Sequence, residues 1–132
     1  MKSRETLLRL KRFQVDEKRR RVTQIQSMMA EFERMAADLD REILGEEERV
    51  GIHDPTHFAY PTYARAAAQR RDNLLRSAEE LRGQLDDAQE QLGTALEELQ
   101  KVEALEQRDR AEEAPIERAS SRRAGYGGMR AV

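Results

Sequence analysis

Apolar residues recur at every seventh position through the first part of the chain. This repeat consists of Leu8, Val15, Val22, Met29, Ala36, Ile43 and Val50. A companion set three residues further on becomes apolar at Ile25, Phe32 and Leu39. A seven-residue repeat keeps one face of a helix turned toward a partner helix. We therefore expect a coiled-coil helix over about residues 4–50.

A second apolar pattern runs through the later part of the chain, with spacings that alternate between four and three. Its seam consists of Leu74, Ala78, Leu81, Leu85, Ala88, Leu92, Ala95, Leu99 and Val102. This rhythm predicts a second coiled-coil helix over about residues 62–113. Pro115 is expected to stop it, because proline cannot donate the next backbone hydrogen bond. Residues 115–132 contain three glycines and several arginines, which predict a disordered basic tail.

Residues 51–61 separate the two patterns and contain glycine and proline. Gly51 can end the first helix. The second helix can begin at Pro55 or at Thr62, and a start at Pro55 would place Pro61 inside the helix, where it would kink it. We place the turn over about residues 51–61.

Two predicted helices of similar length around a short turn indicate an all-α fold, an antiparallel coiled-coil hairpin over residues 1–114. With the turn centred near residue 57, position i faces about position 114 minus i. Met29 then faces Leu85, and Lys11 lies near Glu103.

Charge supports the antiparallel direction. Residues 1–23 hold nine basic and three acidic groups, a net charge of +6, and residues 76–113 hold five basic and twelve acidic groups, a net charge of −7. Complementary charges along the edges of a coiled coil select its orientation. Glutamates 46–48 lie at the negative end of the first helix, where we expect fraying.

Composition favours long solvated helices over a globular core. Of the 132 residues, 38% are charged and only 5% are aromatic, yet the net charge is −2 and the leucines are periodic, which argues against disorder. The chain has no cysteine, so disulfides and thiolate sites are excluded, and a cytoplasmic location is expected. We expect no signal peptide and no transmembrane segment.

Candidate catalytic chemistry is weak. His53 and His57 are four residues apart, but Pro55 intervenes and no third ligand is evident, so we expect exposed loop histidines and no metal. The many paired carboxylates lack a pocket that would shift their pKa values. We therefore expect no catalytic residues, no cofactor and no enzymatic activity.

A basic run at residues 18–21 raises the alternative of a nucleic-acid binder. Net charge is negative and no aromatic residues are interleaved to stack bases, so we expect no nucleic-acid partner. Binding to a membrane surface is also weakly indicated, because Phe13 is the only interfacial aromatic residue of the first helix's basic segment.

Three aromatic residues gather at the turn: Phe58, Tyr60 and Tyr63. They can pack on one another and on the alanines at 66–68, which would cap the end of the hairpin. Alternatively they form an exposed docking patch, since aromatic side chains are enriched at binding hot spots. The residues leave both interpretations open.

Three stretches carry a resemblance to a known family: TLLRLKRFQVDEKRRRV near the start, FAYPTYARAAAQRRDNLL in the middle and LEELQKVEALEQRDRAEEA late in the chain. Over about residues 1–114 the sequence resembles the flagellar export protein FliJ family in its alphaproteobacterial form. The tail departs from the usual pattern of that family, in which the second helix often continues in charged residues.

The resemblance implies a non-enzymatic, soluble component of the flagellar type III export apparatus. It implies an antiparallel coiled coil that inserts its helix ends into the ring of the export ATPase, a second contact with the membrane-embedded export gate, and help in recycling export chaperones. It also implies a cytoplasmic protein held peripherally at the inner-membrane export apparatus. The ATPase-facing end would hold Leu8, Arg9, Arg12, Val15, Val102, Leu105 and Arg108. The alternative function is a generic structural or holdase coiled-coil module.

Overall fold

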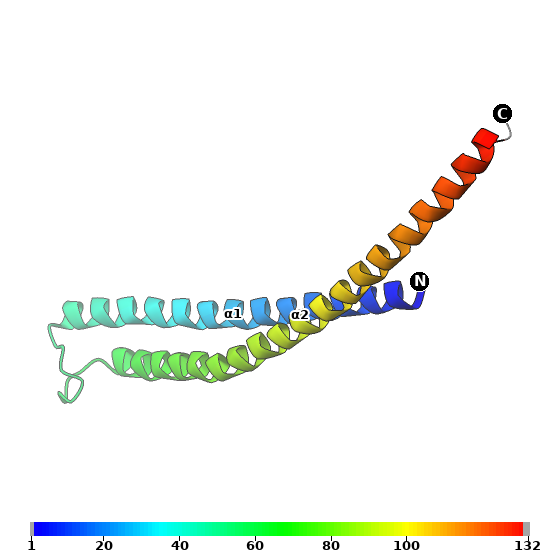
Figure 1. The fold of residues 1–132 in the computed structure, drawn as a ribbon. Coiled ribbons are helices and arrows are strands. Elements are labelled where there is room, and N and C mark those ends of the chain that lie inside the picture. The colour runs from blue at the N-terminus through cyan, green and yellow to red at the C-terminus, as the bar shows by residue number, and fades with distance from the viewer. Residues whose placement is uncertain (1, 131–132) are drawn as a thin grey trace. The chain divides into compact units, whose positions relative to one another are not determined.

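The computed structural model describes residues 2–130 of the chain, with side chains described over residues 3–113. It contains two long helices, α1 (Lys2–Val50) and α2 (Thr62–Arg130), and no strand in the described part. The two helices pack against each other as a helical hairpin, which confirms the predicted all-α fold. Figure 1 shows α1 and α2 on either side of the connecting residues 51–61, the tip loop.

The chain divides into two compact units. The central unit is Lys18–Gln91, which holds the later part of α1, the tip loop and the first part of α2. The terminal unit joins Met1–Glu17 to Leu92–Val132. Within each unit a stretch of α1 runs antiparallel to a stretch of α2.

The core of the central unit combines larger side chains from α1 with small ones from α2. The buried residues of α1 are Val22, Ile25, Met29, Ala36 and Ile43, and those of α2 are Ala64, Ala67, Ala78, Leu81 and Ala88. Ile25 is the largest fully buried side chain, with 1% of its surface exposed. Alanine on α2 lets the helix backbones approach, while Phe32, Leu74 and Leu85 flank the core half-buried.

The seven-residue repeat separates neighbours in sequence into inner and outer positions. Met29 lies in the repeat and is 8% exposed, whereas Met28 beside it is 45% exposed. Leu39 is half-buried against the core around Ile43. Val50 is the exception, since it lies at the end of α1 and is 38% exposed.

The terminal unit has a seam of its own with fewer buried side chains. Those buried among its described residues are Leu8, Val15, Ala95 and Val102. Leu92 and Leu99 are half-buried beside them. Ion pairs flank this seam: Lys11 Nζ lies 2.9 Å from Glu98 Oε2, and Arg4 pairs with Asp109.

The C-terminus of α1 is well capped, contrary to the fraying expected there. Gly51 adopts a φ of 79°, and its N–H donates to the Glu47 carbonyl at 2.8 Å. A left-handed glycine satisfies carbonyls that the helix end would otherwise leave without donors. Arg49 offsets the nearby acidic charge by pairing with Glu46, and this pairing lowers the pKa of Glu46.

The second helix begins at Thr62, so the start at Pro55 is excluded. The Pro61 carbonyl accepts from the Arg65 N–H at 3.1 Å, which makes Pro61 the residue that opens the helix. Asp54 instead closes a turn of the tip loop, where its Oδ1 accepts from the Thr56 N–H at 2.9 Å and from the Thr56 hydroxyl at 2.7 Å.

The pairing register differs from the predicted one by about five residues. Lys11 bonds Glu98, not Glu103, and Lys18 Nζ donates to Gln91 Oε1 at 3.0 Å. Both pairs place position i opposite 109 minus i. The reason is the tip loop, whose last residues already run back along α1, so that Tyr60 contacts Glu47 and the turn is centred nearer residue 54.

The predicted end of the second helix also needs correction. We expected it near residue 113, before Pro115, but α2 extends to Arg130. An interior proline removes one backbone hydrogen bond and crowds the preceding turn, which weakens a helix without forbidding its continuation. The side chains of residues 114–132, which include the predicted tail at 115–132, lie outside the described ones.

Candidate protein-binding surfaces

The predicted ATPase-facing residues all belong to the terminal unit but divide into two groups. Leu8 and Val15 are each 3% exposed and Val102 is 7% exposed, so these three side chains form the seam. The remaining members are exposed: Arg9, Arg12, Leu105 and Arg108. Only this second group is available to another protein.

Arg9 and Arg12 lie in a shallow polar groove between the helices of the terminal unit. The groove is lined by Glu5, Leu8, Arg9, Arg12, Glu103, Glu106, Gln107 and Arg110. Arg110 already pairs with Glu106 at 2.8 Å. Within the described side chains, Arg9 and Arg12 form no ion pair within 4 Å, so their guanidinium groups can meet an acidic partner surface.

Exposed apolar side chains accompany these arginines in the terminal unit. Leu7, Leu10 and Phe13 of α1 are 40%, 49% and 55% exposed, and Leu105 of α2 is 43% exposed. Leu7 and Leu10 were not predicted as surface features, because they lie off the seven-residue repeat, which predicts only the residues of the seam. Their position off that repeat is itself the signal that could have identified them.

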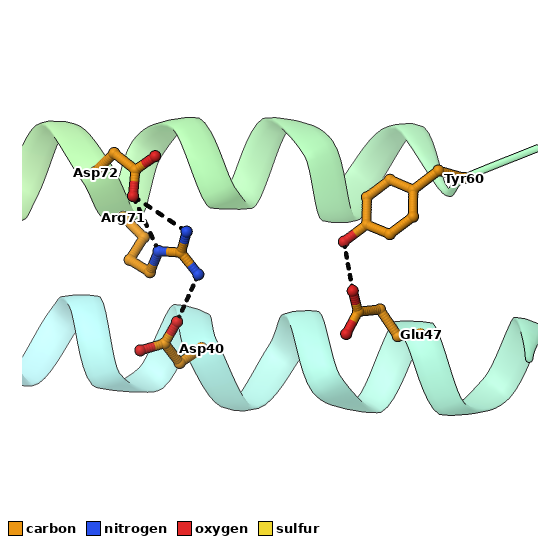
Figure 2. Close-up of polar contacts among 5 residues, drawn as sticks. All are labelled: Asp40, Glu47, Tyr60, Arg71 and Asp72. Atoms are coloured by element: carbon orange, nitrogen blue, oxygen red, sulfur yellow. Dashed lines mark hydrogen bonds and ion pairs between the residues drawn. The ribbon is translucent and has the colours of Figure 1, made fainter. Parts of the chain in front are cut away.

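The three aromatic residues near the turn do not form one docking patch. Tyr60 is 6% exposed and belongs to the cluster of Ile43, Ala64 and Ala67, so the exposed-patch interpretation is wrong for this residue. Its hydroxyl donates to Glu47 Oε2 at 2.8 Å (Figure 2), which raises the pKa of Tyr60. Arg65 lies over the ring, 5.7 Å from its centroid.

Tyr63 and Phe58 remain exposed, but in different settings. Tyr63 is 57% exposed and donates its hydroxyl proton to Glu42 at 2.8 Å, which raises the pKa of Tyr63. Phe58 is 95% exposed and stacks on His57, with ring centroids 4.8 Å apart and planes inclined by 21°. Phe58 is therefore the exposed aromatic anchor of the tip loop.

The two loop histidines are engaged separately. His53 Nδ1 lies 3.6 Å from Glu47 Oε1, and His57 Nδ1 accepts a hydrogen bond from the Ala59 N–H at 3.0 Å. No group of three or more histidine, cysteine, aspartate or glutamate side chains within the described residues is arranged to hold a metal ion.

A hollow opens beside the tip loop, within the central unit. It is lined by Asp40, Ile43, Leu44, Glu47, Pro55, Tyr60, Ala68 and Arg71 and has a volume of about 370 Å³. Arg71 borders it and is held in place by two ion pairs (Figure 2). Its Nη1 lies 2.8 Å from Asp40 Oδ1, and its Nη2 lies 3.1 Å from Asp72 Oδ1. The pairing with Asp40 raises the pKa of Arg71. We call this feature the tip hollow; no local pattern in the sequence predicted it.

Comparison with known proteins returned no match: no family model, no curated protein and no solved structure corresponds to this chain. In the described part of the chain, neither helix contains a stretch apolar enough and long enough to cross a membrane.

Proposed function

We propose that this protein is a non-catalytic helical hairpin that binds the ATPase of flagellar protein export, contacts the export gate and helps to cycle export chaperones. In this proposal it works peripherally at the inner-membrane export apparatus, on the cytoplasmic side. It binds other proteins and supplies no catalytic group.

The observation that carries the proposal is the surface of the terminal unit. There, Arg9 and Arg12 are exposed without an ion-pair partner among the described side chains, and they lie in the same unit as exposed Leu10, Phe13 and Leu105. Arginine and aromatic residues are enriched at protein interfaces, and arginine is among the residue types that dominate their binding energy. The resemblance of the sequence to the FliJ family supports an export ATPase as the partner.

Ion pairs between the two helices decide which basic side chains of this surface remain available to a partner. Lys11 pairs with Glu98 and Arg4 with Asp109, so part of the basic charge of α1 is already satisfied within the hairpin. The arginines left over are the ones a partner can use. Such rim charges chiefly set the association rate and its salt dependence.

The test uses the purified full chain with its cognate hexameric export ATPase. We expect the chain to bind the ATPase and to change its hydrolysis rate. The double variant Arg9→Glu with Arg12→Glu should weaken binding by about tenfold or more, because like charges then face each other across the interface. The matched control is Arg19→Glu with Arg20→Glu, two exposed arginines on the same helix within the central unit.

Absence of binding by the wild-type chain, or equal loss in both double variants, would refute this assignment. Deletion of the gene supplies an independent readout, because an export component is required for motility. A generic structural module would leave motility intact.

The second candidate function is a holdase for unfolded clients. It is favoured by large apolar side chains that are exposed in both units, for example Leu10, Leu44, Phe58 and Leu75. A holdase should suppress aggregation of unrelated denatured proteins, and that activity should not depend on Arg9 or Arg12. Suppression assays on the double variant therefore separate the two functions.

A further inference from the structure

The tip loop carries one aromatic ring that is almost fully exposed to solvent. Phe58 is 95% exposed, far more than any other large apolar side chain among the described residues. Isolated exposed apolar residues are common on proteins, but a phenylalanine with almost its whole surface in water is a costly feature that a contact would relieve.

The loop that carries Phe58 is fixed by a chain of local hydrogen bonds. The His57 N–H donates to the Asp54 carbonyl at 3.1 Å, and the Tyr60 N–H donates to the His57 carbonyl at 3.0 Å. Below the loop, the Tyr60 hydroxyl is held by Glu47. His57 additionally supports the Phe58 ring by stacking. Because these hydrogen bonds hold the loop backbone, docking the loop costs less conformational entropy than docking a flexible segment.

The same unit contains a hollow suited to an aromatic ring. The tip hollow has apolar walls from Ile43, Leu44 and Pro55, and its volume is about 370 Å³. The charged groups of Asp40, Glu47 and Arg71 also line it. An apolar cavity of roughly 150 Å³ is known to accept a benzene molecule, so the volume of the hollow suffices for a phenyl ring. Leu44 is 54% exposed at its edge, and Arg71 can lie against the face of an entering ring.

The Phe58 ring and the tip hollow are adjacent, but the ring does not occupy the hollow of its own chain. Pro55 lines the hollow only three residues before Phe58, yet the exposure of Phe58 shows that its ring does not occupy the hollow. A two-fold arrangement satisfies both features at once, because an isologous contact pairs each patch with its complement on the second copy. We propose that the protein self-associates through its central unit, with Phe58 of each copy seated in the tip hollow of the other.

The size and charge of this contact determine its strength. Two phenylalanine rings and two hollows bury less than the ~1,200 Å² of a standard interface, so the dimer is weak and transient. Residues 38–72 carry eight acidic and five basic groups, so the two tips repel each other electrostatically. Added salt screens this repulsion. Self-association should therefore strengthen with salt, whereas a contact between basic and acidic segments would weaken.

Sedimentation of the full chain from about 10 µM to about 1 mM tests the proposal. The weight-average mass should rise from the monomer value of 15.3 kDa toward twice that value. Phe58→Ser should abolish the rise. Phe13→Ser is the matched control, since Phe13 is 55% exposed in the terminal unit, and this variant should associate like the wild type.

The hollow is tested by Leu44→Glu, which places a charge at its edge and should abolish the rise. Its control is Leu75→Glu, because Leu75 is 44% exposed in the same unit without lining the hollow.

Three results would overturn the proposal: a chain that stays monomeric throughout this range, association that survives Phe58→Ser, or association that survives Leu44→Glu. If a different protein occupies the tip, the purified chain alone stays monomeric, which is the first of these results. The inference rests on the central unit alone and is independent of ATPase binding, which is assigned to the terminal unit, so either can fail without the other.

Discussion

Glu47 is the residue whose environment departs most from its sequence context. It belongs to a run of three glutamates near the end of α1, yet it is 8% exposed while Glu48 is exposed. Tyr60 supplies a hydrogen bond from across the turn. A buried carboxylate without such a donor would be strongly unfavourable. The Tyr60–Glu47 pair therefore links the end of α1 to the end of the tip loop.

Replacing Tyr60 by phenylalanine should destabilise the protein, because Glu47 loses its tyrosine donor. The effect should exceed that of Tyr63→Phe, whose partner Glu42 is exposed and can bond water instead. Thermal denaturation at pH 7 followed by circular dichroism measures the difference. Equal melting temperatures for the two variants would contradict this assignment.

The same pair makes stability depend on alkaline pH. The pKa of Tyr60 is raised above its ordinary value of 10.0 by its bond to Glu47, so the native state retains this proton more strongly than the unfolded state. This contribution is fully present below pH about 10 and is lost as pH rises through the raised pKa. Wild-type protein should therefore lose melting temperature over the interval that begins near pH 10.0 and continues as pH rises through the raised pKa.

Tyr60→Phe should lose less over that interval, because it lacks the titrating group. Tyr63 has a raised pKa for the same reason, so some alkaline loss should persist in the variant. A loss in Tyr60→Phe equal to that of the wild type would show that Tyr60 does not carry this dependence.

The core of the central unit predicts a large effect at one position. Ile25→Ala removes the largest fully buried side chain and should cost about 2–5 kcal/mol, the transfer free energy plus that of the resulting cavity. Leu75→Ala, at a leucine that is 44% exposed, should cost far less. Urea denaturation of both variants measures the free energies of unfolding. Comparable costs would mean that the seam around Ile25 is not the core.

At the scale of elements, the glycines separate a required backbone conformation from a merely tolerated one. Gly51 has a φ of 79°, whereas Gly83 lies inside α2, and an added Cβ at either position would meet nothing within 4 Å. Any cost of alanine is therefore conformational at both. Gly51→Ala should destabilise by about 1–2 kcal/mol, because left-handed backbone is unfavourable for residues with a Cβ.

Gly83→Ala should instead stabilise by about 0.8–1 kcal/mol, since alanine loses less backbone entropy in a helix. Opposite signs for the same chemical change, measured by urea denaturation, would establish Gly51 as the cap of α1. A stabilising effect at Gly51 would contradict the capped end.

The helices and the inner face of each could be predicted from sequence, because period and burial are local properties. The repeat through Leu8, Val15 and Val22 correctly marks buried positions. The register could not be predicted, because it depends on how residues 51–61 fold back. That loop conformation also decides the partner of Lys11 and the burial of Tyr60. Pairings such as Asp40 with Arg71 follow from the register and leave no mark in either local sequence.

At the scale of the whole molecule, the two units differ in how much they bury. The terminal unit buries Leu8, Val15, Ala95 and Val102 among its described residues, whereas the central unit buries a longer series and is closed by the tip loop. Regions with fewer buried apolar side chains open at lower free energy. The terminal unit therefore carries both the smaller core and the surface proposed to bind the ATPase.

Hydrogen exchange should reveal this difference. Amides of residues 3–17 and 92–113 should exchange faster than those in the helices of residues 18–91. Mass spectrometry of peptides from the exchanged protein measures both sets in one experiment, and bound ATPase should slow the terminal set selectively. Uniform protection along α1 would contradict the division into units.

The neighbours Met28 and Met29 allow local opening of the central unit to be measured by oxidation. Met28 is 45% exposed and Met29 is 8% exposed, although both thioethers belong to the same turn of α1. Peroxide converts accessible methionine into its polar sulfoxide. The first residue therefore records the oxidant dose, and the second records how often the seam opens. The ratio of Met29 oxidation to Met28 oxidation within a single peptide therefore reports local opening of the native protein without any added label.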